Sequence, residues 1–170
     1  MSQRNACNSL RLVKLQQQDL VFYLSIYTDP ELMQFIGKIQ SVEKLQRSFQ
    51  LTLDYMSRQP PEMLLFVLRS LKGEAVGVGI LNFRHQTERK AEIGVIICQQ
   101  HQRQGYSYQA KRLLIAAAFE DFKATAVTAI CQIDNAFANR ANQKLGFRIE
   151  KTETDSKDKQ TKNYWILEKR

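Results

Sequence analysis

A short polar loop with a single glycine lies between an apolar strand pattern, Lys90 to Cys98, and an amphipathic helix pattern that ends at Phe122. A glycine loop at a helix start can present backbone N–H groups to a phosphate, because glycine allows close approach and the helix end is partly positive. The loop lacks the three glycines of a dinucleotide fingerprint and the Gly-Lys-Ser/Thr of a Walker loop. From the residues alone, the loop of Gln102, Arg103, Gln104, Gly105, Tyr106 and Ser107 is therefore either a phosphate site of another type or an ordinary strand-to-helix turn.

A second polar signal lies further along the chain, where an asparagine opens a helix. Asn135 follows the apolar strand pattern Thr125 to Ile133, and Gly146 closes the helix after Leu145. Asparagine is a common helix N-cap, and glycine suits the left-handed residue after a helix. From the residues alone, Asn135 is therefore a cap.

The order of these motifs resembles the acetyl-CoA core of the GNAT N-acetyltransferases. The loop of that family reads Arg/Gln-x-x-Gly-x-Gly/Ala, and this chain has Ser107 in the last small position. The core begins with Ala91 to Gly94 and ends with Lys144 to Phe147, and both segments resemble the RimJ/RimL and polyamine acetyltransferase branch. Tyr27 to Met33 resembles the N-terminal segment of the same branch. We expect residues 1–170 to form one domain of this family.

The resemblance implies acetyl-CoA as co-substrate and no metal. In the family, the loop backbone, here Gln102 to Ser107, holds the pyrophosphate. The strand before the loop separates from the next strand and gives its backbone to the pantetheine, a role that falls here on Val95, Ile96 and Ile97. A free backbone N–H there would stabilise the oxyanion. By the same resemblance, Asn135 also contacts the pantetheine.

The groups that transfer protons are harder to assign. Many relatives carry a general-acid tyrosine four residues before the glycine of the Gly-Phe pair, and that position here is Asn142. Some RimL-type relatives use a serine three residues after the helix-opening asparagine, and that position is Ala138. Water would then protonate the CoA thiolate, or the chain would be a poor catalyst. Glu92 is the best candidate for a base, and pairing with a neighbouring cation is the alternative for it.

These motifs need a scaffold, and the apolar periodicity predicts an α/β fold. We expect a mixed, mostly antiparallel sheet of about seven strands with helices on both faces. The predicted helices are Gln17–Tyr27, a short one from Asp29 to Gly37, one capped by Ser41 and stopped at Pro60, Gly105–Phe122 and Asn135–Leu145. The predicted strands are Leu10–Leu15, Met63–Arg69, Ala75–Phe83, Lys90–Cys98, Thr125–Ile133, Phe147–Thr154 and Asn163–Glu168.

Composition limits the class of protein. The 170 residues suit one domain that needs no disulfide, and the three cysteines at unrelated spacings favour reduced thiols in a cytoplasm. No signal peptide and no apolar run of about 20 residues is evident, so no membrane partner is expected. His85 and His101 are expected to be solvated, without a zinc site.

The net charge of +8 raises the question of a nucleic-acid partner. The charges are dispersed, and the densest cluster, Lys151 to Lys162, mixes both signs. A solvated basic surface and attraction for an anionic cofactor explain the charge better. A homodimer stays open.

The resemblance predicts N-acetylation of a primary amine from acetyl-CoA. A protein or peptide N-terminus is favoured over a free polyamine, because a protein of charge +8 repels a polycation at long range. Glu92, Glu62 and Asp54 could form a local acidic pocket that overrides this repulsion. Polyamines, amino-sugar antibiotics and a CoA-binding regulatory domain with little turnover are the alternatives.

Overall fold

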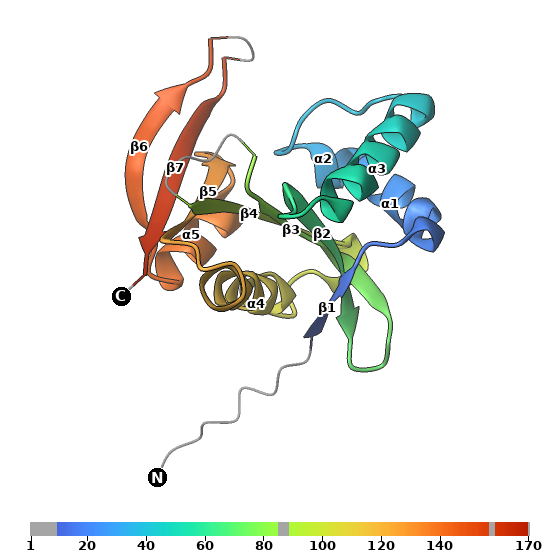
Figure 1. Ribbon diagram of the computed structural model, residues 1–170. Helices are drawn as coiled ribbons and strands as arrows, with labels where there is room; N and C mark the ends of the chain where they lie inside the picture. Colours follow the sequence, from blue (N-terminus) through green and yellow to red (C-terminus); the bar gives the residue numbers. More distant parts are fainter. Residues whose placement is uncertain (1–9, 85–88, 157–158, 170) are drawn as a thin grey trace.

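The computed structural model describes residues 10–84, 89–156 and 159–169. Its centre is a seven-stranded sheet with the order β1-β2-β3-β4-β5-β7-β6 (Figure 1). Every neighbouring pair is antiparallel except β4 and β5, which are parallel. The expected mixed, mostly antiparallel sheet is confirmed. The strands are β1 Leu10–Lys14, β2 Met63–Ser70, β3 Ala75–Asn82, β4 Lys90–Ile97, β5 Ala126–Gln132, β6 Arg148–Thr154 and β7 Thr161–Glu168.

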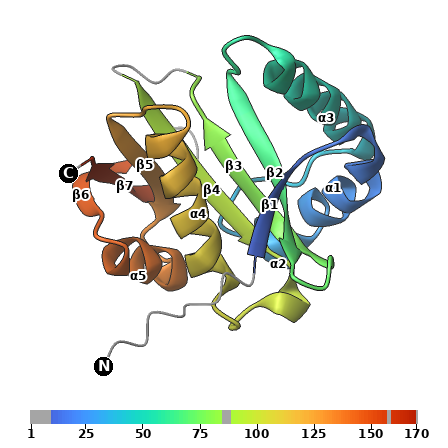
Figure 2. The ribbon, with the colours of Figure 1, turned by 60° about the horizontal axis from the view of Figure 1, so that its bottom comes forward.

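Helices cover both faces of the sheet, as Figures 1 and 2 show. One face carries α1, α2 and α3, and the other carries α4 and α5. None of the described helices combines the length and the apolar character that crossing a bilayer requires. The helices are α1 Leu20–Tyr27, α2 Pro30–Met33, α3 Val42–Ser57, α4 Tyr106–Glu120 and α5 Ala136–Lys144, with short 3-10 turns η1 Gln17–Asp19 and η2 Gln99–His101.

The helix expected from Gln17 onward starts as a 3-10 turn instead of an α-helix. Asp19 Oδ2 accepts the Gln16 N–H at 2.8 Å, and Asp19 Oδ1 pairs with Arg69 of β2 at 3.3 Å. An aspartate whose carboxylate accepts a hydrogen bond from a preceding backbone N–H is favoured at a helix end and not in a helix interior. The α-helix therefore begins only at Leu20.

Other helix ends follow their sequence signals. Asp29 Oδ1 accepts the N–H groups of Glu31 and Leu32 at 2.9 and 3.1 Å, and Ser41 Oγ accepts that of Lys44 at 3.4 Å. These side chains cap α2 and α3 as predicted. Helix α2 ends at Met33, before Gly37.

Alternation along β4 separates two cores. Ala91 and Ile93 pack in a cluster with Leu114 of α4, whereas Ile96 packs in the cluster of Phe49 from α3. Because successive strand side chains point to opposite faces, Glu92 lies on the face that α1 and α3 cover. The predicted amphipathic helix is α4, and the most buried residues of its apolar face are Ala110, Leu114 and Ala118.

Candidate active site

The loop before α4 presents backbone donors at a helix start. Gly105 is the N-cap with φ of +80°, and no side chain caps the helix. The first bond of the helix runs from Gln109 N–H to Gly105 O at 3.2 Å, so the N–H groups just ahead of it have no partner in the helix. A Cβ at Gly105 would meet only Gln109 Nε2, at 4.0 Å. This geometry leaves room for an anion at the positive end of the α4 dipole.

Side chains of the loop hold the loop itself. Gln102 Nε2 donates to Ile97 O at 3.1 Å, which ties the loop to the end of β4. Gln104 Nε2 donates to Gln100 O at 3.1 Å. Arg103 takes a φ of +61°, a left-handed conformation that turns the chain before Gly105. The loop therefore offers its backbone to a ligand and uses the two glutamines for its own shape.

The last part of β4 faces an opening in the sheet. β4 pairs with β3 along nearly its whole length, but with β5 only from Lys90 to Glu92. The Cys98 N–H donates to Val76 O of β3 at 2.9 Å. The backbone N–H and C=O groups of consecutive strand residues point to opposite edges of the strand. Those of Ile96 therefore point toward β3, like those of Cys98, and those of Val95 and Ile97 point toward the β5 side. Val95 thus lies where the resemblance expects an oxyanion donor.

A group of buried polar side chains, here called the buried amide cluster, lies between α4, α5 and β5. Lys111 and Asn142 are 6% and 1% exposed, and Lys111 Nζ donates to Asn142 Oδ1 at 2.5 Å. Asn142 Nδ2 contacts Cys131 Sγ at 3.7 Å, and Cys131 Sγ in turn contacts Asn139 Oδ1 at 3.2 Å. Burial lowers the pKa of the Lys111 ammonium to about 8. Burial also raises the pKa of the Cys131 thiol.

Two asparagines fix α5 against the sheet. Asn135 Oδ1 accepts the Ala138 N–H at 3.1 Å, which is the predicted cap. Asn139 Nδ2 donates to Gln132 O at 2.8 Å, and Asn139 Oδ1 accepts from Trp165 Nε1 at 3.1 Å. Asn139 therefore joins α5 to the end of β5 and to β7, and so holds Asn142 one turn further along the same helix.

Glu92 lies on the other side of the sheet from the buried amide cluster. It is opposite Asn82 of β3 and Thr128 of β5, at the last residue pair before β4 and β5 separate. Burial raises the pKa of its carboxyl above the ordinary value. A carboxylate with a raised pKa at this point is better able to accept a proton near neutral pH.

Residues 9–148 match the acetyltransferase (GNAT) domain family. The chain belongs to the GNAT family. It is an acetyl-CoA-dependent N-acetyltransferase, and acetyl-CoA is its co-substrate. A comparison with the sequences of curated proteins finds no match.

Solved structures share the fold at low sequence identity. One is a spermidine N-acetyltransferase from Vibrio cholerae in complex with CoA and spermine, with 17% identity and a TM-score of 0.83 over 94% of this chain and 95% of that one. Another is a GNAT-family acetyltransferase from Bacillus anthracis, with 17% identity and a TM-score of 0.79 over 94% and 95%. Both confirm the GNAT fold that the sequence predicts.

Sequence reasoning missed two residues of the buried amide cluster, Lys111 and Asn139. Lys111 lies three residues before Leu114 and seven before Ala118, so it falls on the apolar stripe of α4. A lysine at a stripe position was the signal that could have revealed it. Asn139 had no comparable signal, because its partners come from β5 and β7.

The expectation of two solvated histidines is corrected for one of them. The His101 side chain is only 12% exposed, and its Nε2 lies 3.8 Å from Glu74 Oε1. The 3-10 turn η2 folds His101 back onto the start of β3, which a linear loop pattern does not show. His85 lies outside the described residues. In the described part of the chain, no three His, Cys, Asp or Glu side chains gather in a way that could hold a metal ion.

Proposed function

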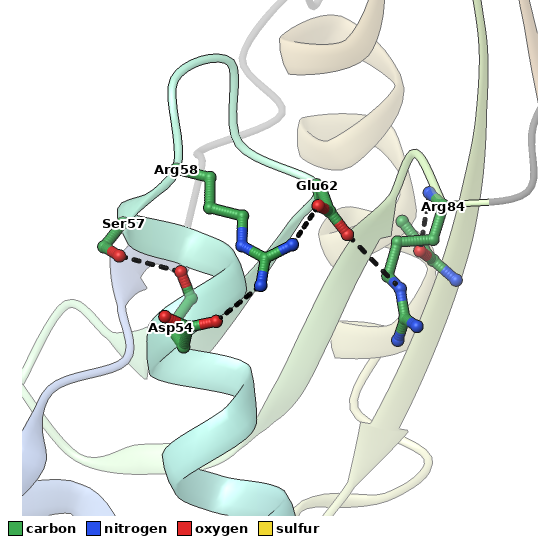
Figure 3. Close-up of polar contacts among 6 residues, drawn as sticks. Asp54, Ser57, Arg58, Glu62 and Arg84 are labelled. Atoms are coloured by element: carbon green, nitrogen blue, oxygen red, sulfur yellow. Dashed lines mark hydrogen bonds and ion pairs between the residues drawn. The ribbon is translucent and has the colours of Figure 1, made fainter.

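We propose that this GNAT enzyme acetylates the N-terminal amine of a protein or peptide, as in the RimJ/RimL branch. The observation that carries the proposal is that two acidic side chains, Asp54 and Glu62, form ion pairs with arginines on the face of the sheet that carries Glu92. Asp54 and Glu62 are held by Arg58 and Arg84 in a group that we call the surface arginine network (Figure 3). Asp54 and Glu62 thus already have a cationic partner, which weakens their attraction for a polycation.

The geometry of this network supports that reading. Arg58 Nη2 lies 2.8 Å from Asp54 Oδ2, Arg58 Nη1 also bonds Glu62, and Arg84 Nε lies 3.6 Å from Glu62 Oε2. Both guanidinium groups lie over the Tyr55 ring, with Cζ at 4.8 and 4.0 Å from its centroid. The network stands where α3 ends and β2 begins, on the face of the sheet that carries Glu92. A face whose carboxylates are paired with arginines attracts a polycation less than one whose carboxylates are unpaired.

We assign the site residues as follows. The loop backbone holds the pyrophosphate, and the open edge of β4 at Val95 holds the pantetheine and the oxyanion. Asn135 adds a pantetheine contact to its cap. Glu92 accepts the proton that the acceptor amine loses, directly or through water.

The acceptor is tested by comparing acetyl transfer to short peptides with free N-termini and to spermidine. Peptides of the same sequence with a blocked N-terminus are the matched control. We expect CoA release with the free peptides and little with the blocked ones. Strong turnover of spermidine with none of the peptides would overturn the proposal.

The cofactor site is tested with Gly105→Val, followed by calorimetry with acetyl-CoA. The valine side chain would enter the open space above the loop. The backbone of residue 105 would also have to keep a φ of +80°, which is unfavourable for valine. We expect the affinity for acetyl-CoA to fall far more than the stability. Wild-type affinity in a folded Gly105→Val variant would contradict the loop assignment.

Polyamine acetylation is the second candidate, because the Vibrio cholerae protein with a similar fold is a spermidine N-acetyltransferase. A CoA-binding domain with little turnover is the third, since residue 142 is not a tyrosine. Binding of acetyl-CoA without CoA release for any amine would favour this third reading.

A further inference from the structure

Transfer of an acetyl group from a thioester leaves a thiolate that must gain a proton, and Asn142 cannot supply one usefully. From the geometry of the buried amide cluster, we infer that Lys111 is the catalytic residue that protonates the departing CoA sulfur. The inference rests on the acetyl transfer of the proposed function, and it holds for any amine acceptor.

The first argument is the position of Lys111. Its Nζ lies 2.5 Å from Asn142 Oδ1, at the residue where many relatives carry their acid. Asn142 in turn contacts Cys131, which lies three residues beyond Thr128, the last β5 residue paired with β4. Lys111 is also six residues after Gly105 on α4, about 9 Å along the helix axis. Lys111 therefore belongs to the helix that begins at the phosphate loop, and its ammonium bonds the residue of α5 that stands at the position of the family's acid.

The second argument is the hydrogen bonding of the ammonium. An ammonium group carries three N–H donors. In the described part of the chain, Asn142 Oδ1 is the one acceptor within hydrogen-bond distance of Lys111 Nζ. No described carboxylate forms an ion pair with it, and the other ionisable group beside it is the Cys131 thiol. The neutral amide therefore holds the ammonium without the ion pair that would keep it protonated.

The third argument is the acidity of the group. Burial lowers the pKa of Lys111 to about 8, so the ammonium is mostly protonated at neutral pH and yet gives up its proton readily. An acid of this kind is suited to a thiolate leaving group. Glu92 lies across the sheet, so the base for the amine and the acid for the sulfur approach the thioester from opposite faces.

The step is balanced. The acceptor nitrogen forms a bond to the acetyl carbon, the C–S bond breaks, and its electron pair goes to sulfur. The proton from Lys111 Nζ moves to that sulfur and gives the CoA thiol. The proton lost by the amine goes to Glu92 or to water, and Lys111 is protonated again from solvent before the next turnover.

The test uses the full chain with its best amine acceptor and the variants Lys111→Met and Lys111→Arg. Methionine removes the proton, and arginine keeps the positive charge but holds its proton too tightly to release it. Lys144→Met is the matched control, because Lys144 also bridges α5 and α4, with its Nζ 5.1 Å from the Tyr108 ring, at the exposed surface.

We expect kcat to fall about 100-fold in both Lys111 variants, with little change in the calorimetric Kd for acetyl-CoA and little effect of Lys144→Met. The ratio of wild-type to variant rates should decrease toward one as the pH rises above about 8, where wild-type Lys111 is neutral too. The titration of the acceptor cancels in this ratio. The double variant Lys111→Met with Asn142→Tyr should recover part of kcat, because it supplies an acid from α5.

A wild-type kcat in Lys111→Arg would overturn the inference, since charge alone would then suffice. A rate ratio that does not change with pH would overturn it as well. If Lys111→Met does not fold, the pH dependence of the wild-type to Lys111→Arg ratio decides. A wild-type chain that transfers acetyl to no amine would contradict the proposed function itself.

Discussion

Lys111 and Arg58 are both cations held by neighbouring side chains, but Lys111 is buried between two helices and Arg58 is at the surface. Hydrogen bonds with Glu62 and Asp54 raise the pKa of Arg58, whereas burial lowers that of Lys111 to about 8. The Arg58 side chain is 46% exposed and has two carboxylate partners, and Lys111 has a neutral amide. The comparison shows that solvent and the charge of the partner decide whether a cation keeps its proton or can transfer it.

The largest difference between the two groups should appear in the pH dependence of stability. The ordinary pKa of Lys111 is 10.5 and its pKa in the fold is about 8, so between these values the unfolded chain binds more protons. Stability should therefore rise with pH across this window, by about 3 kcal/mol in full. Denaturant unfolding of the wild type and of Lys111→Met at pH 7 and pH 10.5 measures it. From pH 7 to pH 10.5 the stability of the wild type relative to Lys111→Met should rise by this amount, and an unchanged difference would show that Lys111 titrates normally.

Asn142→Leu should have the next largest effect. It removes the Asn142 oxygen from a buried ammonium and should destabilise the fold by about 2 kcal/mol. The loss is limited because removing the acceptor lowers the pKa of Lys111 further, so the lysine can release its proton instead of staying charged. Asn142→Asp is the informative partner, because a carboxylate beside Lys111 should raise that pKa and move the alkaline loss of activity to higher pH. A fully stable Asn142→Leu protein would mean that the ammonium finds another acceptor.

The smallest effect is expected in the surface arginine network. Glu62→Gln should change the free energy of unfolding by less than about 1 kcal/mol, because exposed ion pairs contribute little and salt screens them. Equilibrium unfolding at low and high salt measures this change, and Asp54→Asn serves as the parallel variant. A loss that matches that of Asn142→Leu would place this network among the main supports of the fold.

Local sequence signals predicted much of the architecture. The caps at Asp29, Ser41 and Asn135, the left-handed Gly146 and the apolar strand β4 depend on neighbours in the sequence, and each lies where its pattern placed it. The short pairing of β4 with β5 was expected only from the family resemblance. Strand separation depends on packing around both strands, which no local pattern reports.

The candidate site was less predictable than the fold. The position of Asn142 could be counted from the Gly-Phe pair, but its partner Lys111 is 31 residues away on another helix. The ion pair of Glu62 with Arg84 likewise depends on how β2 and the end of β3 meet, whereas Arg58 bonds Asp54 and Glu62 four residues away along the chain. Sequence spacing thus indicated which residues could do chemistry. The hydrogen-bond and ion-pair partners of those residues depend largely on tertiary contacts.

In the described part of the chain, β5 pairs with β4 only as far as Glu92, which leaves room for a ligand along the rest of that edge. The amide-rich pantetheine arm can take the place of the missing strand segment and bond the exposed edge at Val95 and Ile97. The cofactor would then be an eighth, borrowed strand as well as a reactant. Amide protons at these two residues should exchange with deuterated water quickly in the free protein and slowly once acetyl-CoA is bound.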